Sequence, residues 1–213
     1  MTRILVFGDS IACGAWDYEE GGWVNRLRKF LDRKILVDRK FDYRVYNLGV
    51  SGDTTEDLLY RFEFEAKNRL KESEENVFII TIGINDSLLL IDKKELITPS
   101  EKFRKNIQKL IKLSSKFTGK IIFVGLTPVV ESKVNPLLWR KEVSYKNEYI
   151  KEYNEIIKSV CKENDVKFIE IFEEWIKSDY KILLEDGVHP NSEGHEKIFE
   201  TVKREINIIY PKV

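Results

Sequence analysis

Short apolar runs alternate with longer amphipathic segments along this chain of 213 residues. Most of the five runs are apolar at nearly every position, and they occupy residues 4–7, 43–48, 77–82, 120–125 and 167–171. Strands that are apolar on both faces are typical of a parallel sheet covered by helices. Their alternation with helical segments predicts an α/β fold with a doubly wound parallel sheet.

The segments between the runs carry apolar side chains at helical spacing. Trp23, Leu27 and Leu31 share one face of the first such segment, and similar patterns recur later in the chain, through 103–114, 149–160 and 198–209. Each apolar stripe can cover one face of a sheet. Ligands of open α/β sheets bind beyond the carboxyl ends of the strands, so the residues that follow each run are the candidates for function.

Composition excludes several classes of protein. The 36 Lys+Arg balance 36 Asp+Glu, which argues against a dedicated nucleic-acid binder. The longest apolar stretches, 77–84 and 121–130, are far shorter than the ~20 residues of a membrane-spanning helix. Cys13 and Cys161 make no disulfide framework and indicate a reducing compartment. We expect one domain over residues 1–213, cytoplasmic because no signal-peptide pattern precedes the first run, and without integral membrane association.

Ser10 directly follows the first apolar run, in the sequence Gly8-Asp9-Ser10. A serine at such a corner can cap the next helix, or it can present its hydroxyl as a nucleophile. Neither a dinucleotide-binding nor a phosphate-binding glycine motif follows the run. The G-x-S-x-G motif is also absent, because Ala12 stands two residues after the serine. The residues alone leave capping and nucleophilic attack open.

His189 is the candidate base for such a nucleophile. Asp186 precedes it by three residues, close enough to accept a hydrogen bond from Nδ1 and leave Nε2 free as the base. Pro190 keeps His189 out of the following helix. A surface histidine beside an Asp-Gly turn is the alternative. His195 is expected to be structural or on the surface, and the sequence has no zinc-binding spacing.

Two further loops carry candidate donors for an oxyanion, which acyl transfer requires. Gly52 follows the second apolar run and offers a backbone N–H without a side chain in the way. Asn85 follows the third run and offers a side-chain amide. Both residues are also common in simple turns, so each signal is weak by itself.

Taken in order, these segments resemble the sequence blocks of the SGNH hydrolase family, also called the GDSL esterase/lipase family. Gly8-Asp9-Ser10 is similar to its first block and Gly52 to its second. Asn85, followed by an aspartate, is similar to the third block, and Asp186-x-x-His189-Pro190 to the fifth. The sequence departs from the family pattern at one position in each of two blocks. In the first block Ile11 replaces the usual leucine, and in the third block Ile84 is larger than the residue often found there.

The resemblance implies a three-layer α/β/α, flavodoxin-like domain with five parallel strands. It implies a serine esterase, lipase or acylhydrolase in which Ser10 is the nucleophile, His189 the base, and Asp186 orients the base. The oxyanion hole would comprise the backbone N–H groups of Ser10 and Gly52 and the side-chain amide of Asn85. Neither a cofactor nor a metal is implied, and the partner is a small-molecule ester or thioester. A flavodoxin-like module that binds a small ligand without turnover is the alternative.

The substrate itself stays open among lipids, acyl thioesters, aryl esters and acetylated sugars. Apolar residues at 88–91 and 126–139 either line a cleft or form core beneath a long loop. Trp16 and Tyr18 follow the candidate nucleophile and are candidates to border a cleft. A homodimer is also left open, because the sequence does not show which apolar side chains are exposed.

Overall fold

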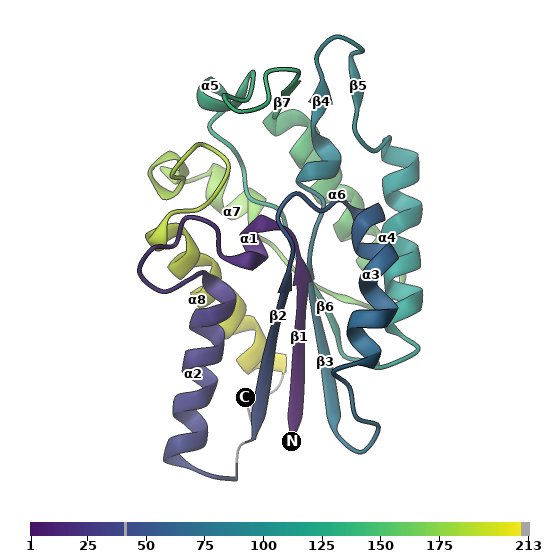
Figure 1. Ribbon diagram of the computed structural model, residues 1–213, viewed down its shortest axis with the longest axis vertical. Helices are drawn as coiled ribbons and strands as arrows, with labels where there is room; N and C mark the ends of the chain where they lie inside the picture. The colour runs from purple at the N-terminus through teal and green to yellow at the C-terminus, as the bar shows by residue number, and fades with distance from the viewer. Residues whose placement is uncertain (41, 210–213) are drawn as a thin grey trace.

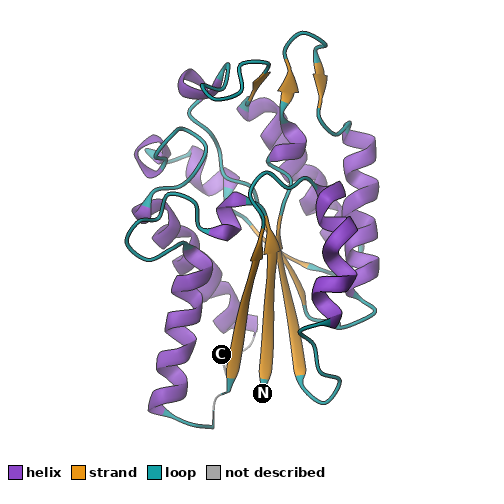
Figure 2. Cartoon of the chain, viewed as in Figure 1, coloured by secondary structure: helices purple, strands orange, loops and turns teal. Residues whose placement is uncertain are grey.

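A five-stranded parallel sheet forms the centre of the protein in this computed structural model (Figures 1 and 2). The structure describes residues 1–40 and 42–209, without the side chains of 207–209. The predicted domain over residues 1–213 extends beyond these residues, and the predicted apolar position Ile209 has no described side chain. The strand order is β2-β1-β3-β6-β8. The strands are β1 (Thr2–Gly8), β2 (Tyr43–Gly49), β3 (Glu75–Thr81), β6 (Ile121–Val124) and β8 (Lys167–Ile169).

Register brings the ends of the three neighbouring strands to one level. Gly8 at the end of β1 lies opposite Gly49 of β2 and Thr81 of β3. The loops that follow these strands therefore begin side by side at the carboxyl edge of the sheet. This alignment is what allows residues far apart in sequence to meet in one site.

Helices cover both faces of the sheet, and the predicted three-layer α/β/α fold is confirmed (Figure 1). On one face α2 (Trp23–Val37) packs against α8 (Ser192–Ile209). On the other face α4 (Ser100–Ser114) packs between its two neighbours, α3 (Thr55–Lys67) and α6 (Asn147–Glu163). The predicted apolar stripes are buried, as Trp23, Leu27 and Leu31 of α2 illustrate.

The apolar pattern of the sequence does not mark α3 as a helix. Two of its large apolar side chains face solvent, since Tyr60 is 95% exposed and Phe64 is 74% exposed. Phe62, Phe64 and Ala66 alternate with glutamate and lysine, a spacing typical of a strand. The helix is nevertheless well capped, because the Thr54 hydroxyl accepts from the Asp57 N–H while the Asp57 carboxylate accepts from the Thr54 N–H.

A second, antiparallel sheet of three short strands was not apparent from the sequence. Its order is β5-β4-β7, with β4 (Leu89–Leu90), β5 (Glu95–Leu96) and β7 (Val143–Ser144). It lies beyond the carboxyl edge of the main sheet, near α5 (Glu131–Val134) (Figure 1). Strands of two residues are too short for a periodic signal. The remaining helical elements are short: α1 (Ser10–Cys13), η1 (Asn85–Ser87), α7 (Phe172–Ile176) and η2 (Tyr180–Leu183).

None of the helices within the described ranges is both long enough and apolar enough to span a bilayer.

Candidate active site

Ser10 opens the short helix α1, but it does not cap it. The cap is Asp9, whose carboxylate accepts from the backbone N–H of Ile11 at 2.9 Å. The capping interpretation of Ser10 is therefore wrong, and its hydroxyl serves another contact. Ser10 Oγ lies 2.9 Å from Nε2 of His189. That distance is suited to transfer of the hydroxyl proton to the imidazole.

Asp186 holds the other side of the His189 ring. Its Oδ2 lies 2.7 Å from His189 Nδ1, and its Oδ1 accepts from the backbone N–H groups of Val188 and His189 at 2.9 and 2.8 Å. Gly187 makes this tight turn with a φ of +98°, where a side chain would be strained. Burial acts to raise the pKa of the Asp186 carboxyl, but these hydrogen bonds outweigh it and hold the pKa well below its usual range. An ionised carboxylate here keeps the proton of the neutral ring on Nδ1.

Trp16 makes a contact with this pair that the sequence did not indicate. Its indole Nε1 lies 2.7 Å from Asp186 Oδ2 and 3.1 Å from His189 Nδ1. The indole and imidazole rings meet edge to face, with centroids 6.1 Å apart. The sequence placed Trp16 only near a cleft, because nothing local connects it to a carboxylate 170 positions away.

Gly52 and Asn85 both lie beside Ser10 in the same cleft. Gly52 has a φ of +87°, a backbone conformation that favours glycine, and it lines the cleft without a side chain to obstruct its N–H. The Asn85 amide is held at both ends. Its Oδ1 accepts from the Tyr145 hydroxyl at 2.7 Å, and its Nδ2 donates one hydrogen to the Asp53 carbonyl at 2.9 Å. The second Nδ2 hydrogen remains available to a ligand.

The cleft has a volume of about 460 Å³. Around the polar residues above, its walls are mainly aromatic and aliphatic: Trp16, Leu88, Leu137, Trp139, Tyr145 and Val188. Leu88 and Leu137 are almost fully buried and still contribute to the wall. For Leu88 and Leu137 the two interpretations, core and cleft lining, therefore both hold, whereas Val129 is core alone and Leu138 is exposed.

Two buried carboxyls lie behind the site. Burial raises the pKa of Asp9 to about 7; the Ile11 N–H and the charge of His189 oppose this, while the negative charges of Asp86 and Asp53 add to it. Burial likewise raises the pKa of Asp86 to about 6, against hydrogen bonds from Thr55. Both carboxyls therefore hold their protons to higher pH than an exposed aspartate does.

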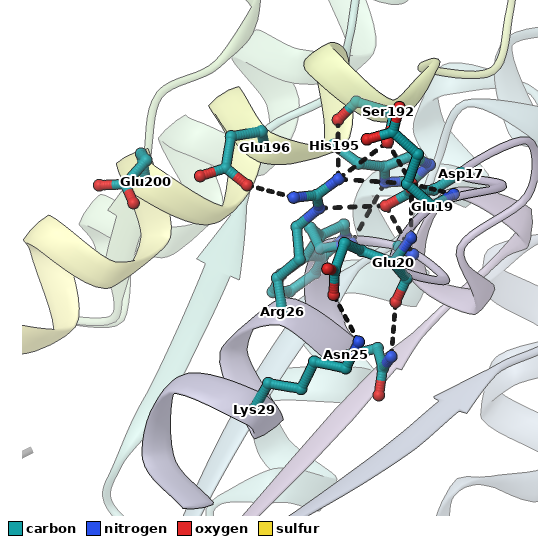
Figure 3. Close-up of polar contacts among 12 residues, drawn as sticks. Asp17, Glu19, Glu20, Asn25, Arg26, Lys29, Ser192, His195, Glu196 and Glu200 are labelled. Carbon is teal, nitrogen blue, oxygen red and sulfur yellow. Dashed lines mark hydrogen bonds and ion pairs between the residues drawn. The ribbon is translucent and has the colours of Figure 1, made fainter. Parts of the chain in front are cut away.

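His195 is structural. It is fully buried, and its Nδ1 accepts from the Trp23 N–H at 3.3 Å while its Nε2 donates to the Ala15 carbonyl at 3.0 Å. Burial lowers the pKa of His195, so the ring is neutral and this tautomer is fixed by its two partners. Figure 3 shows the ring beside an ion-pair network that includes Asp17 and Arg26. No group of metal-ligating side chains occurs among the residues that the structure describes.

Comparison with known proteins gives consistent matches over the chain. The sequence model of a family described as GDSL-like Lipase/Acylhydrolase matches residues 4–202. The uncharacterized lipoprotein YqeF of Bacillus subtilis is 26% identical over 211 residues, which cover 90% of this chain and 82% of that protein. Esterase TesA of Pseudomonas aeruginosa is 24% identical over 199 residues, covering 93% and 85%. The solved structure of a lipase/acylhydrolase from Enterococcus faecalis has a TM-score of 0.74 at 24% identity, covering 97% of this chain and 95% of that one.

Proposed function

The chain belongs to the family of GDSL-like lipases and acylhydrolases and is an enzyme of the esterase type, and from this we propose that it hydrolyses small carboxylic esters through an acyl-serine intermediate on Ser10. The observation that best supports the proposal is a continuous chain of contacts at the cleft. Ser10 Oγ, both ring nitrogens of His189 and Asp186 Oδ2 follow one another at 2.9 and 2.7 Å. A binding module that lacks turnover is not favoured, because binding alone does not require this relay.

Acylation begins when His189 Nε2 takes the proton of the Ser10 hydroxyl. The freed Oγ bonds to the carbonyl carbon of the ester, and the carbonyl oxygen becomes an oxyanion. The backbone N–H groups of Ser10 and Gly52 and the second amide hydrogen of Asn85 donate to it. As the oxyanion collapses, the bond to the alcohol oxygen breaks, and His189 passes its proton to that oxygen.

Deacylation repeats the steps with water. His189 Nε2 takes a proton from water, and the hydroxide oxygen bonds to the acyl carbon. The second oxyanion collapses, the carboxylic acid leaves, and Ser10 Oγ recovers the proton from His189. Throughout, the negative charge of Asp186 stabilises the imidazolium and keeps the ring oriented.

The cleft favours a small, partly apolar ester. Its volume of about 460 Å³ falls within the range of about 300–1,000 Å³ typical of small-molecule sites. Its exposed walls are rings, since Trp16 is 44% exposed and Trp139 is 57% exposed. Arg140 also lines the cleft, but its guanidinium is paired with Glu142 at 3.0 Å, so the lining carries little net charge for an ionic substrate group.

Hydrolysis of a p-nitrophenyl ester series, from acetate to palmitate, tests the proposal. We expect turnover by the wild type and none above background by Ser10→Ala. Ser51→Ala is the matched control, because Ser51 lines the same cleft but has no contact with the relay. A fluorophosphonate probe should label the wild type and Ser51→Ala but not Ser10→Ala. A folded wild type that neither hydrolyses any ester nor reacts with the probe would contradict the acyl-serine mechanism.

For the compartment we propose the cytoplasm. Both cysteines are free thiols, with Cys13 exposed and Cys161 buried. Exposed free thiols persist in reducing surroundings. Fractionation of the source cells, with an antibody against this protein, would test the proposed location.

A further inference from the structure

We propose that Trp16 is a positioning residue of this site, whose indole N–H fixes the Asp186 carboxylate and, through it, the ring of His189. The inference rests on the proposed function, because a positioning role presupposes the reaction. Neither the residue type of Trp16 nor its position in the sequence indicates that its indole would hydrogen-bond to a carboxylate of the site.

The hydrogen bonds of Asp186 are the first step. Oδ1 already accepts two backbone N–H groups from its own turn. Oδ2 accepts from His189 Nδ1 at 2.7 Å and from Trp16 Nε1 at 2.7 Å. Among the described residues, the indole therefore supplies the one hydrogen bond to Oδ2 from outside the 186–189 turn. It adds a fixed donor to the oxygen that orients His189, and so restricts rotation of the carboxylate beyond what the two backbone contacts of Oδ1 achieve.

The second step concerns the protonation of the ring. Trp16 Nε1 also lies 3.1 Å from His189 Nδ1. While Nδ1 carries its proton it cannot accept a hydrogen bond, so the indole hydrogen must go to Oδ2. If the indole donated to Nδ1 instead, Nε2 would carry the proton and could not act as base. The ionised carboxylate decides between the two arrangements, because it attracts both N–H groups to the same oxygen.

The third step is that the chain holds Trp16 in an uncommon conformation. Its φ is +68°, in the left-handed region that bulky residues rarely occupy. Such conformations persist only where surrounding contacts over-determine them, and they cluster at functional sites. Both neighbours of Trp16 are tied down: Ala15 donates its N–H to the Ser10 carbonyl at 3.0 Å and accepts from His195 at 3.0 Å.

Asp17 provides the anchor on the other side. Its carboxylate accepts from the Ser192 hydroxyl at 2.6 Å and from Arg26 Nε at 3.1 Å, which joins the loop to α8 and α2 (Figure 3). It also accepts backbone N–H groups of its own loop, including that of Gly22 at 2.9 Å. Burial acts to raise the pKa of Asp17, but the hydrogen bonds from Ser192 and Arg26 hold it well below the usual range. The anchor is therefore charged wherever the enzyme is folded near neutral pH.

Trp16→Phe removes the N–H and keeps an aromatic ring. Trp139→Phe is the matched control: Trp139 stacks near His189, with centroids 6.5 Å apart, and lines the same cleft, but the structure gives it no hydrogen bond to the relay. The assay is kcat and KM for p-nitrophenyl acetate from pH 5 to 9, with circular dichroism to verify folding. Loss of one hydrogen bond to a charged group should lower the kcat of Trp16→Phe about tenfold, with KM changed no more than in Trp139→Phe.

The pH profile separates positioning from a merely structural role. The indole N–H partly neutralises Asp186, so its removal strengthens the attraction between that carboxylate and the imidazolium. The acidic limb of kcat/KM should move to higher pH by a few tenths of a unit in Trp16→Phe and stay in place in Trp139→Phe. In the part of the chain that the structure describes, the other charged or titratable groups near His189 are Asp9 from the β1–α1 corner, His195 from α8, and Tyr145 and Arg140 in the cleft lining. Neither substitution removes any of them.

The inference would be overturned if Trp16→Phe had the same kcat as the wild type and the same acidic limb of kcat/KM. Trp16 would then be only a wall of the cleft. The titration of the His189 ring, followed by NMR in the resting protein, gives an answer even if no ester is hydrolysed. The chain has only 2 histidines, so the signal is readily assigned. A titration that moves in Trp16→Phe supports the contact, whereas one that coincides with wild type refutes it. An inactive wild type would count against the proposed function, not against this contact.

Discussion

Replacing the buried acid behind the nucleophile should make the protein more stable at alkaline pH. Asp9 is 2% exposed and caps α1 through Oδ1. Asparagine is an equally good cap, so Asp9→Asn keeps the hydrogen bond to the Ile11 N–H while it removes the ionisable proton. The small cavity beside Asp9 is also lined by Trp23 and Thr127, whose indole N–H and hydroxyl are buried without a partner among the described residues.

The size of the effect follows from the pKa of Asp9, which burial raises from 3.8 to about 7. Between these values the folded protein holds a proton that the unfolded chain has released, so the free energy of unfolding falls as pH rises. A difference of about 3 units at about 1.36 kcal/mol each costs the wild type at most about 4 kcal/mol. The penalty is absent below about pH 4 and complete above about pH 7.

Urea denaturation of wild type and Asp9→Asn at pH 4, 5, 6, 7 and 8 measures this directly. The quantity to follow is the variant's free energy of unfolding minus that of the wild type. Any constant cost of burying the amide cancels when this difference is compared across pH. We expect it to rise in favour of the variant by up to about 4 kcal/mol between pH 4 and pH 8.

A difference that stays constant across this range would refute the reasoning, because Asp9 would then titrate alike in the folded and unfolded states. Asp92→Asn is the control for the general effect of removing a carboxyl. Asp92 lies on the exposed turn after β4. Its replacement should leave the difference in unfolding free energy flat.

Three further substitutions test the proposed chemistry and its supports. Asn85→Ala should lower kcat for p-nitrophenyl acetate by roughly 10²–10³, the usual loss for one oxyanion donor; an unchanged kcat would remove the amide from the oxyanion hole. Tyr145→Phe should cost about tenfold in the same assay, because it frees the Asn85 oxygen but leaves the amide in place; a loss as large as that of Asn85→Ala would indicate a direct role for the phenol. Asp186→Asn should be less stable than wild type at pH 7, and in urea titrations the gap should begin to narrow as pH falls below about 4 and keep narrowing at lower pH, because a carboxyl with a depressed pKa stabilises the fold only while ionised; a gap as wide at about pH 2 as at pH 7 would contradict this.

Much of the fold was predictable because its signals are local. Strands buried on both faces are apolar at successive positions, as in Val77–Ile80. Covering helices repeat their apolar residues at helical spacing, as in α2. The signal failed where local pattern and burial disagree, as in α3 with its exposed Tyr60 and Phe64, and where strands are only two residues long, as in β4.

For the candidate site, too, the sequence identified the residues and the structure showed how they come together. Ser10, Gly52 and Asn85 could be proposed from sequence because each follows a predicted strand. Asp186 and His189 could be proposed from their spacing of three residues and from Pro190, which follows the histidine. The family they resembled is confirmed by the match over residues 4–202. The structure then brings all five residues to the carboxyl edge of one sheet, where the aligned ends of β1, β2 and β3 start their loops together.

Only the tertiary structure decided how those residues are held. Trp16 reaches a carboxylate 170 positions along the chain, and Tyr145 reaches an amide 60 positions away. The burial that raises the pKa of Asp9 likewise comes from packing around the site and not from its neighbours in sequence. Sequence periodicity reports which face of an element is buried, because that depends on a residue's own neighbours. Hydrogen bonds between separate loops depend on how whole elements pack, and no local pattern encodes them.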